Sequence, residues 1–146
     1  MNTSPLTILS NDSTITVHLG NYRDVLNDVT GDLIFTSPPY NIGSKAERKN
    51  GTNVNKYGRT EIKSYGAIRD YPDHLPELVY QQQQVNFFVW AADHLSPNGT
   101  LVYNHKLRRR NKRMIHPGEW FLRPEVTSRL QLMEDVVWDR GSTEWH

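Results

Sequence analysis

The stretch DLIFTSPPY, from Asp32 to Tyr40, is an apolar run followed by two adjacent prolines. Its first part, Leu33–Phe35, is short, apolar and rich in strand-forming residues, which is typical of an inner strand of a parallel sheet. Pro38 and Pro39 end the strand, because proline has no N–H to donate to a neighbouring strand. The side chains around them are therefore expected at the carboxyl edge of a sheet, where open α/β folds bind their ligands.

Further strands and helices are expected on both sides of this stretch. Thr14–His18 alternates like a strand, and Tyr22–Val29 has the pattern of a short helix. Downstream, the pattern predicts a helix over Asp73–His94, a strand over Thr100–Asn104, a helix starting near Pro117 or Arg123, and a strand over Leu132–Trp138. We interpret the glutamine run Gln81–Gln84 as a polar helix face. Alternating strands and helices predict an α/β protein with a mostly parallel sheet, folded as one domain.

Composition narrows the class of protein. The 146 residues include no cysteine, which excludes disulfides and thiolate metal sites. The six histidines lack the spacing of a zinc site, so no metal is expected. No signal sequence and no apolar run of membrane-spanning length is evident, so the sequence predicts a soluble, cytoplasmic protein.

Positive charge is concentrated in two segments, although the net charge is only +1. Residues 41–70 carry +4 and residues 106–146 carry +3, while the segments before each of them carry −3. Six cations within eight residues predict contact with nucleic-acid phosphates, with a solvated charged loop as the alternative: Lys106, Arg108, Arg109, Arg110, Lys112 and Arg113. Residues 41–70, which are rich in glycine, are interpreted as a long mobile loop that is a weaker candidate for the same contact.

The motif Thr36–Tyr40 resembles the catalytic motif of DNA amino-methyltransferases, which transfer a methyl group from S-adenosylmethionine to an exocyclic base nitrogen. Leu95–Leu101 and Val136–Gly141 are similar to further segments of that family, so the resemblance spans roughly residues 14–146. It implies a Rossmann-like methyltransferase sheet that acts on double-stranded DNA. Serine in the motif favours N4 of cytosine as the target, and N6 of adenine stays open.

The chemistry of an exocyclic amine explains the motif. The amine is a poor nucleophile because its lone pair is delocalised into the base ring. The Ser37 hydroxyl and the Pro38 carbonyl are expected to accept hydrogen bonds from the amine, which favours a tetrahedral nitrogen. Pro39 stiffens the turn, and Tyr40 offers a flat face to a base that has been extruded from the duplex.

The expected cofactor site is incomplete. The resemblance implies that Asn21 and Thr36 contact S-adenosylmethionine, although relatives usually carry an acidic residue in place of Asn21. The nine glycines contain no Gly-x-Gly, so the family's glycine-rich cofactor turn has no counterpart. In the subgroup with this motif order, that turn and the target-recognition region would lie beyond His146. We therefore expect the catalytic half of a methyltransferase. It is interpreted as a truncated or decayed gene product, an excised fragment, or a subunit whose partner chain supplies the cofactor motif and target recognition.

Other interpretations remain open at this point. The chain is also consistent with a non-catalytic DNA-binding remnant or one subunit of a split methyltransferase. The segment Ser37–Tyr40 alone also fits a polyproline II turn, or a docking peptide for an aromatic groove. Trp90, Trp120 and Trp138 are expected to be core or interface rings, with base stacking as the alternative.

Overall fold

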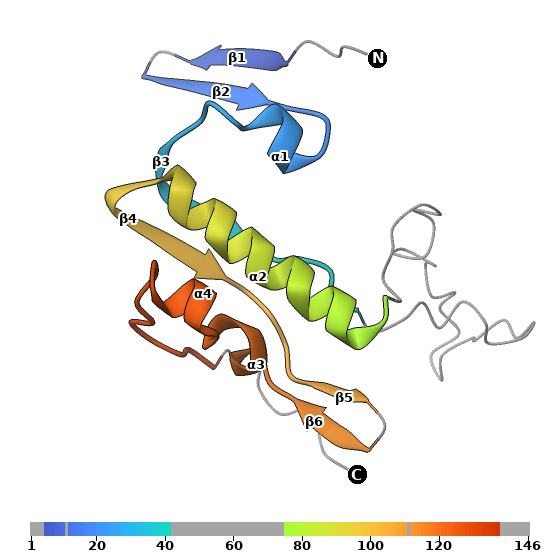
Figure 1. Cartoon of the computed structure of the whole chain (residues 1–146). Coiled ribbons are helices and arrows are strands. Elements are labelled where there is room, and N and C mark those ends of the chain that lie inside the picture. Colours follow the sequence, from blue (N-terminus) through green and yellow to red (C-terminus); the bar gives the residue numbers. More distant parts are fainter. Residues whose placement is uncertain (1–4, 11, 42–74, 111, 138–146) are drawn as a thin grey trace, which may run out of the picture.

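The computed structural model describes residues 5–10, 12–41, 75–110 and 112–137 (Figure 1). It contains both helices and strands, as the predicted α/β class requires. The predicted loop over residues 41–70 lies outside the described residues, apart from Asn41. In chain order the elements are β1 (Leu6–Ser10), β2 (Ser13–Val17), α1 (Tyr22–Val25), β3 (Gly31–Thr36), α2 (Glu77–His94), β4 (Leu95–Tyr103), β5 (Arg108–Arg110), β6 (Arg113–Ile115), α3 (Gly118–Phe121) and α4 (Pro124–Thr127).

The described strands form three two-stranded sheets, in place of the single mostly parallel sheet that the sequence predicts. β1 pairs with β2 and β5 with β6, both antiparallel, whereas β3 and β4 are parallel. α2 lies between β3 and β4 in the chain, which is the usual way to connect two parallel strands. A wider Rossmann-like sheet is not present in the described part of the chain.

One face of the parallel pair β3–β4 is left exposed by the described residues. Leu33 pairs with Thr100 and Phe35 with Val102, so Leu33, Phe35 and Val102 share a face. Their exposed fractions are 61%, 71% and 40%. The neighbouring Leu101 has the opposite orientation and packs against the hydrophobic core. Since parallel sheets are normally covered on both faces, the exposed face lacks the cover that such sheets have elsewhere.

The core is built on α2, which crosses the middle of the view in Figure 1 and contacts β4 and the short helices α3 and α4. Its buried apolar residues pack with Trp120 of α3 and Val126 of α4. The glutamine run is not a uniform polar face, which corrects the interpretation from sequence. Gln81 and Gln84 are buried, and the Gln84 Oε1 atom accepts a hydrogen bond of 2.8 Å from the Tyr103 hydroxyl.

Several predicted elements differ in the structure. The basic segment forms the β5–β6 hairpin, with Lys112 in the turn at φ 62°. The predicted C-terminal helix is split into α3 and α4. Residues 131–137 have no regular structure and are exposed, so the predicted strand over Leu132–Trp138 is wrong for its described part. β1 is an additional strand that pairs with β2, with Ser10 opposite Ser13.

Gly99 lies at a point where the two parallel strands approach each other closely. A Cβ atom there would lie 2.9 Å from Leu95 Cδ2, 3.1 Å from Ser96 O and 3.2 Å from Gly31 O. Two of these atoms belong to the backbone and cannot rotate away. We expect Gly99→Ala to lower the free energy of unfolding by about 1–3 kcal/mol, measured by urea denaturation.

Gly31→Ala is the matched control at the same irregularity of the pair. Outside the adjacent residues, the atom nearest to a Cβ on Gly31 would be the Leu33 carbonyl oxygen, at 3.8 Å, which is an ordinary contact. We expect this variant to change the free energy of unfolding by less than about 0.5 kcal/mol. Equal destabilisation by both variants would contradict the proposed role of the close approach.

Candidate functional site

Three polar side chains meet at the carboxyl edge of the parallel pair. The Asn104 backbone N–H donates to the Thr36 carbonyl at 2.8 Å, which extends the pairing by one residue. The Ser37 Oγ and Tyr40 Oη atoms lie 2.9 Å apart, and Asn104 Nδ2 donates to both at 3.3 Å. The structure thus brings two residues of the predicted motif together with one that the sequence did not predict.

This cluster can both donate and accept hydrogen bonds. One of the two hydroxyl groups donates its proton to the other, and the second hydroxyl proton is left to point at a ligand. Each hydroxyl oxygen has two lone pairs, and the Asn104 amide uses one on each oxygen. The hydroxyl that accepts from the other uses its second lone pair as well, so one lone pair is left, on the donating hydroxyl. A ligand with amine and carbonyl groups on one edge, such as a nucleic-acid base, has matching chemistry.

The Tyr40 ring is in contact with the start of the basic segment. The Lys106 ammonium lies 5.4 Å from the ring centroid, within the range of a cation–π interaction. The His105 ring packs edge-on at 5.0 Å. A flat ligand that stacks on Tyr40 therefore either displaces Lys106 or uses the opposite face.

Asn41, directly after the motif, is buried and joins it to the segment before α2. Its Oδ1 atom accepts from the Leu75 N–H at 2.7 Å, and its Nδ2 donates to the Leu75 carbonyl at 3.0 Å. The Asn41 backbone has φ 50°, a left-handed conformation that asparagine tolerates better than most residues. These two bonds fix the end of the motif next to the first turn of α2.

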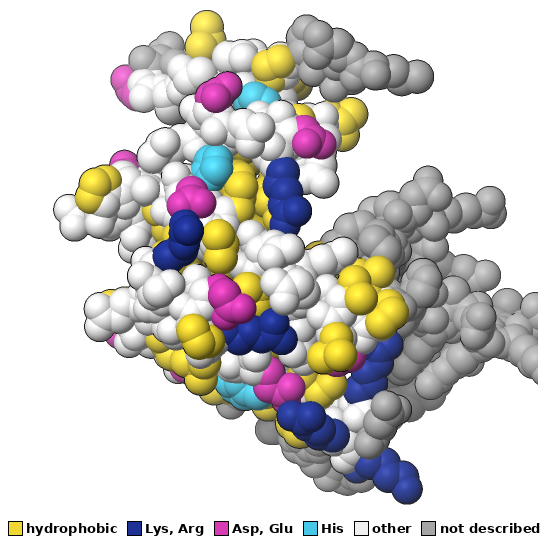
Figure 2. All heavy atoms as spheres, viewed as in Figure 1, with side chains coloured by type: hydrophobic (Ala, Val, Ile, Leu, Met, Phe, Trp, Pro, Cys, Tyr) yellow, Lys and Arg dark blue, Asp and Glu magenta, His cyan; other side chains and the backbone are white. Residues whose placement is uncertain are grey.

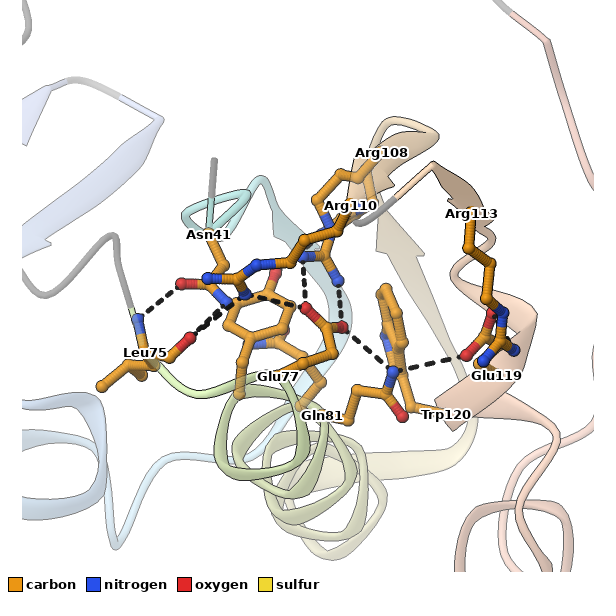
Figure 3. A network of polar contacts seen from close by, with 12 residues as sticks. Asn41, Leu75, Glu77, Gln81, Arg108, Arg110, Arg113, Glu119 and Trp120 are labelled. Carbon is orange, nitrogen blue, oxygen red and sulfur yellow. Dashed lines mark hydrogen bonds and ion pairs between the residues drawn. The ribbon is translucent and has the colours of Figure 1, made fainter. Parts of the chain in front are cut away.

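A buried ion pair connects α2 to the basic hairpin (Figure 3). Both terminal nitrogens of Arg108 donate to Glu77, at 2.6 and 2.9 Å, and Arg110 donates to the same carboxylate at 3.1 Å. The Arg108 guanidinium also lies 4.7 Å from the centroid of the Tyr80 ring. Arg108 is 4% exposed, and its Nε atom has no partner among the described residues, so its charge depends on Glu77.

The same network sets the ionisation of Glu77. Burial raises the pKa of this carboxyl group, but hydrogen bonds from Arg108, Gln81 and Arg110 outweigh burial and lower the pKa to about 2. The position of Glu77 in the first turn of α2 further suits a negative charge, because the N-terminus of a helix carries partial positive charge.

The six predicted phosphate-contacting residues fall into two groups. Figure 2 shows Lys and Arg side chains gathered over the region of the β5–β6 hairpin at the lower edge of the view. Lys106, Arg109 and Lys112 are exposed. Arg113 is exposed but pairs with Glu119 at 3.0 Å, and Arg110 is bound to Leu75 and Glu77. The environment of Arg108 differs most from the expected one, since its guanidinium is buried against Glu77.

The two predicted cofactor residues do not lie in one site. The Asn21 side chain caps α1 by accepting from the Arg23 N–H at 3.0 Å. Thr36 borders a hollow of about 370 Å³ between α1, α2 and β3, and Asn21 does not line it. The hollow is lined mainly by apolar and aromatic side chains, without Asp or Glu: Tyr22, Leu33, Phe35, Phe87 and Trp90 among them.

Among the tryptophans, Trp120 is a core ring as the sequence predicts. Trp90 is half-buried and stacks on His94 with ring centroids 4.1 Å apart. Trp138 lies outside the described residues. Within the described ranges no group of three or more His, Asp or Glu side chains is placed to hold a metal ion, and no helix is long and apolar enough to cross a membrane.

Four residues next to the motif were not predicted from the sequence: Asn41, Tyr80, Asn104 and His105. Asn104 ends the predicted strand Thr100–Asn104 and His105 follows it, and polar residues at that place are a usable signal for a site at a sheet edge. Tyr80 lies within a helix whose pattern only indicates burial. Its contact with the motif depends on tertiary packing.

The Glu77–Arg108 pair gives a prediction for stability. Glu77→Gln leaves a buried guanidinium without its counter-charge, so we expect the free energy of unfolding at pH 7 to fall by about 3–5 kcal/mol. Because the folded-state pKa of Glu77 is about 2, below its ordinary 4.5, ionised Glu77 stabilises the fold fully above about pH 4.5. That contribution is lost as the pH falls towards 2, so the difference between wild type and variant should shrink over this window.

The measurement is denaturant unfolding of both proteins from pH 7 to pH 2. Glu119→Gln is the control, because it breaks the ion pair with Arg113, whose side chain is 72% exposed. We expect that change to cost no more than about 1 kcal/mol. A stability difference for Glu77→Gln that does not vary with pH would show that the ionised carboxylate is not the cause.

We compared the chain with protein-family models, with curated proteins and with solved structures, and none of the three comparisons found a match.

Proposed function

We propose that this chain is the catalytic region of a DNA methyltransferase that uses S-adenosylmethionine to modify an exocyclic amine, N4 of cytosine or N6 of adenine. The observation that carries the proposal is the meeting of Ser37, Tyr40 and Asn104 at the carboxyl edge of the parallel pair. Ligands of open α/β sheets bind at that edge.

The setting of the motif argues against a docking peptide. A docking segment is expected to be exposed and free to adapt to a groove. Here Pro38, Pro39 and Tyr40 are half-buried and Asn41 is buried. The Tyr80 hydroxyl also holds the Pro39 carbonyl at 2.6 Å. These contacts favour a fixed site over a recognition peptide.

The proposed mechanism concerns the target amine. The mechanism requires Ser37 to be the donor in its bond with the Tyr40 hydroxyl. Ser37 also receives one bond from Asn104, so it then keeps one lone pair for the amine. The Pro38 carbonyl accepts the second amine hydrogen. Together they favour a tetrahedral nitrogen whose lone pair points away from the base ring. The Tyr40 ring carries the extruded base, and the methylated, cationic amine then loses a proton to water.

The described residues do not form a complete site for S-adenosylmethionine. The hollow beside Thr36 has no carboxylate that could bind the ribose hydroxyls, and Asn21 is engaged in capping α1. The proposed mechanism therefore includes no contact of these residues with the methyl donor.

DNA contact is proposed for the exposed cations of the hairpin region, Lys106, Arg109 and Lys112. Lys106 already lies beside the Tyr40 ring, so phosphates bound there would flank the extruded base. Arg108 is left out of this set because it is buried and paired with Glu77. Such contacts give affinity that does not depend on DNA sequence.

A second candidate is a subunit that is inactive alone, either part of a split enzyme or a DNA-binding remnant. The bare apolar face of Leu33, Phe35 and Val102 favours it, because an exposed patch of this kind is typical of an interaction surface. The absence of a Gly-x-Gly turn from the sequence supports it as well.

The test is transfer of labelled methyl groups from S-adenosylmethionine to mixed-sequence duplex DNA by the purified chain, followed by nucleoside chromatography. The proposal expects label in 4-methylcytosine or N6-methyladenine. Ser37→Ala should lower transfer at least about 100-fold, as expected for a group that orients the reacting atom, and leave DNA affinity unchanged.

Ser128→Ala is the matched control, because that exposed hydroxyl donates only to the Glu125 carbonyl. It should leave transfer unchanged. DNA binding without any transfer would favour the inactive subunit. If neither transfer nor DNA binding occurs, both candidates are wrong.

Salt dependence tests the DNA contacts. Replacing Lys106, Arg109 and Lys112 together by Gln should reduce the slope of log affinity against log salt by about 0.9 for each phosphate that is no longer neutralised. The measurement is fluorescence anisotropy with duplex DNA at several salt concentrations.

The double variant Arg23→Gln and Arg129→Gln is the control for this measurement. These residues lie in α1 and after α4, away from the hairpin in the chain. Their replacement lowers net charge without removing the proposed contacts. An equal change of slope in both variants would indicate a general charge effect.

A further inference from the structure

A row of hydrogen-bond contacts runs from Pro39 to Lys106 through two side chains. The Tyr80 hydroxyl donates to the Pro39 carbonyl at 2.6 Å, and His105 Nε2 lies 2.7 Å from the same hydroxyl. On the other side of the ring, His105 Nδ1 lies 2.8 Å from the Lys106 carbonyl oxygen. Both ends of the row are carbonyl oxygens, which can only accept hydrogen bonds.

The three contacts require three protons, one for each. Tyr80 supplies one, a neutral imidazole supplies one, and an imidazolium supplies two. Only the imidazolium completes the row. When His105 is neutral, one of the three contacts always lacks a proton. The tautomer of the ring therefore decides whether the Pro39 carbonyl or the Lys106 carbonyl accepts a hydrogen bond.

The surroundings of His105 keep the ring neutral. Burial, together with the positive charges of Arg108 and Lys106, lowers its pKa to about 4. The Lys106 carbonyl and the Glu77 carboxylate act in the opposite direction without restoring the ordinary value of 6.5. The Tyr103 ring stacks on His105 with centroids 5.6 Å apart, and burial raises the pKa of Tyr103, so it stays protonated.

We infer that Tyr80 and His105 are positioning residues, and that the tautomer of neutral His105 selects whether the motif turn or the Lys106 segment is held. With the proton on Nε2, His105 donates to Tyr80 and Tyr80 holds the Pro39 carbonyl. With the proton on Nδ1, His105 holds Lys106, and Tyr80 turns its proton from Pro39 to Nε2.

The consequence for the site follows from the peptide that Tyr80 holds. The Pro39 carbonyl belongs to the peptide bond that leads into Tyr40, so holding it fixes the backbone from which the Tyr40 ring projects, while Ser37 and Asn104 hold the Tyr40 hydroxyl. His105 contacts that ring directly, and Lys106 lies over it. This hydrogen-bond geometry does not depend on any enzymatic activity, whereas a role of Tyr80 and His105 in catalysis rests on the proposed methyl transfer.

The test is ¹⁵N NMR of histidine in the full chain at pH 7, where the ring shifts report which nitrogen carries the proton. The structure, with Tyr80 donating to Pro39, requires the Nε2–H tautomer in the wild type. In Tyr80→Phe the ring loses this partner, so it should change to Nδ1–H, held by Lys106. The Pro39 carbonyl ¹³C signal should move upfield because its hydrogen bond is removed.

Tyr22→Phe is the matched control, because the Tyr22 hydroxyl lies in α1 and contacts Arg23 Nε. It should change neither signal. Nδ1–H in the wild type would overturn the inference, and this measurement needs no variant if Tyr80→Phe fails to fold. An unchanged tautomer in folded Tyr80→Phe would overturn it equally.

Methyl transfer separates the two proposals. If the wild type transfers methyl groups, Tyr80→Phe should lower kcat at least about tenfold with little change in the KM for DNA, because the site is misplaced but still binds. An unchanged kcat would show that the Tyr80 hydroxyl has no role in catalysis. If the wild type transfers no methyl groups, only the proposed function is wrong. The tautomer measurement still decides whether Tyr80 and His105 position the motif turn.

Discussion

The carboxylate of Glu77 joins the first turn of α2 to both arginines that begin and end β5. Arg108 is buried, and a buried charge without its partner is among the most costly defects in a folded protein. Arg110 also donates to the Leu75 carbonyl, and Leu75 is bonded in turn to Asn41 at the end of the motif. The position of the motif therefore depends on one charge pair that lies outside it.

Local sequence patterns predict where single strands and helices form and where they end. The apolar run Leu33–Phe35 and the two prolines predict β3 and its end, and apolar periodicity predicts α2 with its C-terminal end at His94. The pairing of strands is not local. β1 is indicated only weakly, by Asn11 and Asp12 between two alternating runs, a typical hairpin connection. Whether β2 then joins a larger sheet depends on long-range packing.

The candidate site shows the same division. Ser37 and Tyr40 could be predicted because motif and strand coincide in the sequence. The role of Arg108 could not, because a run of cations looks uniformly exposed until the partner of each is known. Glu77, which decides that role, lies 31 positions earlier in the chain. Tyr80 lies in α2 and His105 follows β4, and only the fold places the Tyr80 hydroxyl between the Pro39 carbonyl and the His105 ring.

The bonds between Asn41 and Leu75 have a consequence for variation among related chains. They hold the two ends of residues 42–74 together by a single side chain, independently of what lies between. The entropy cost of closing such a segment rises only by about 0.6 kcal/mol when its length doubles. Insertions and deletions between the two residues are therefore expected to be nearly neutral for the candidate site, and related chains should differ more in length here than elsewhere.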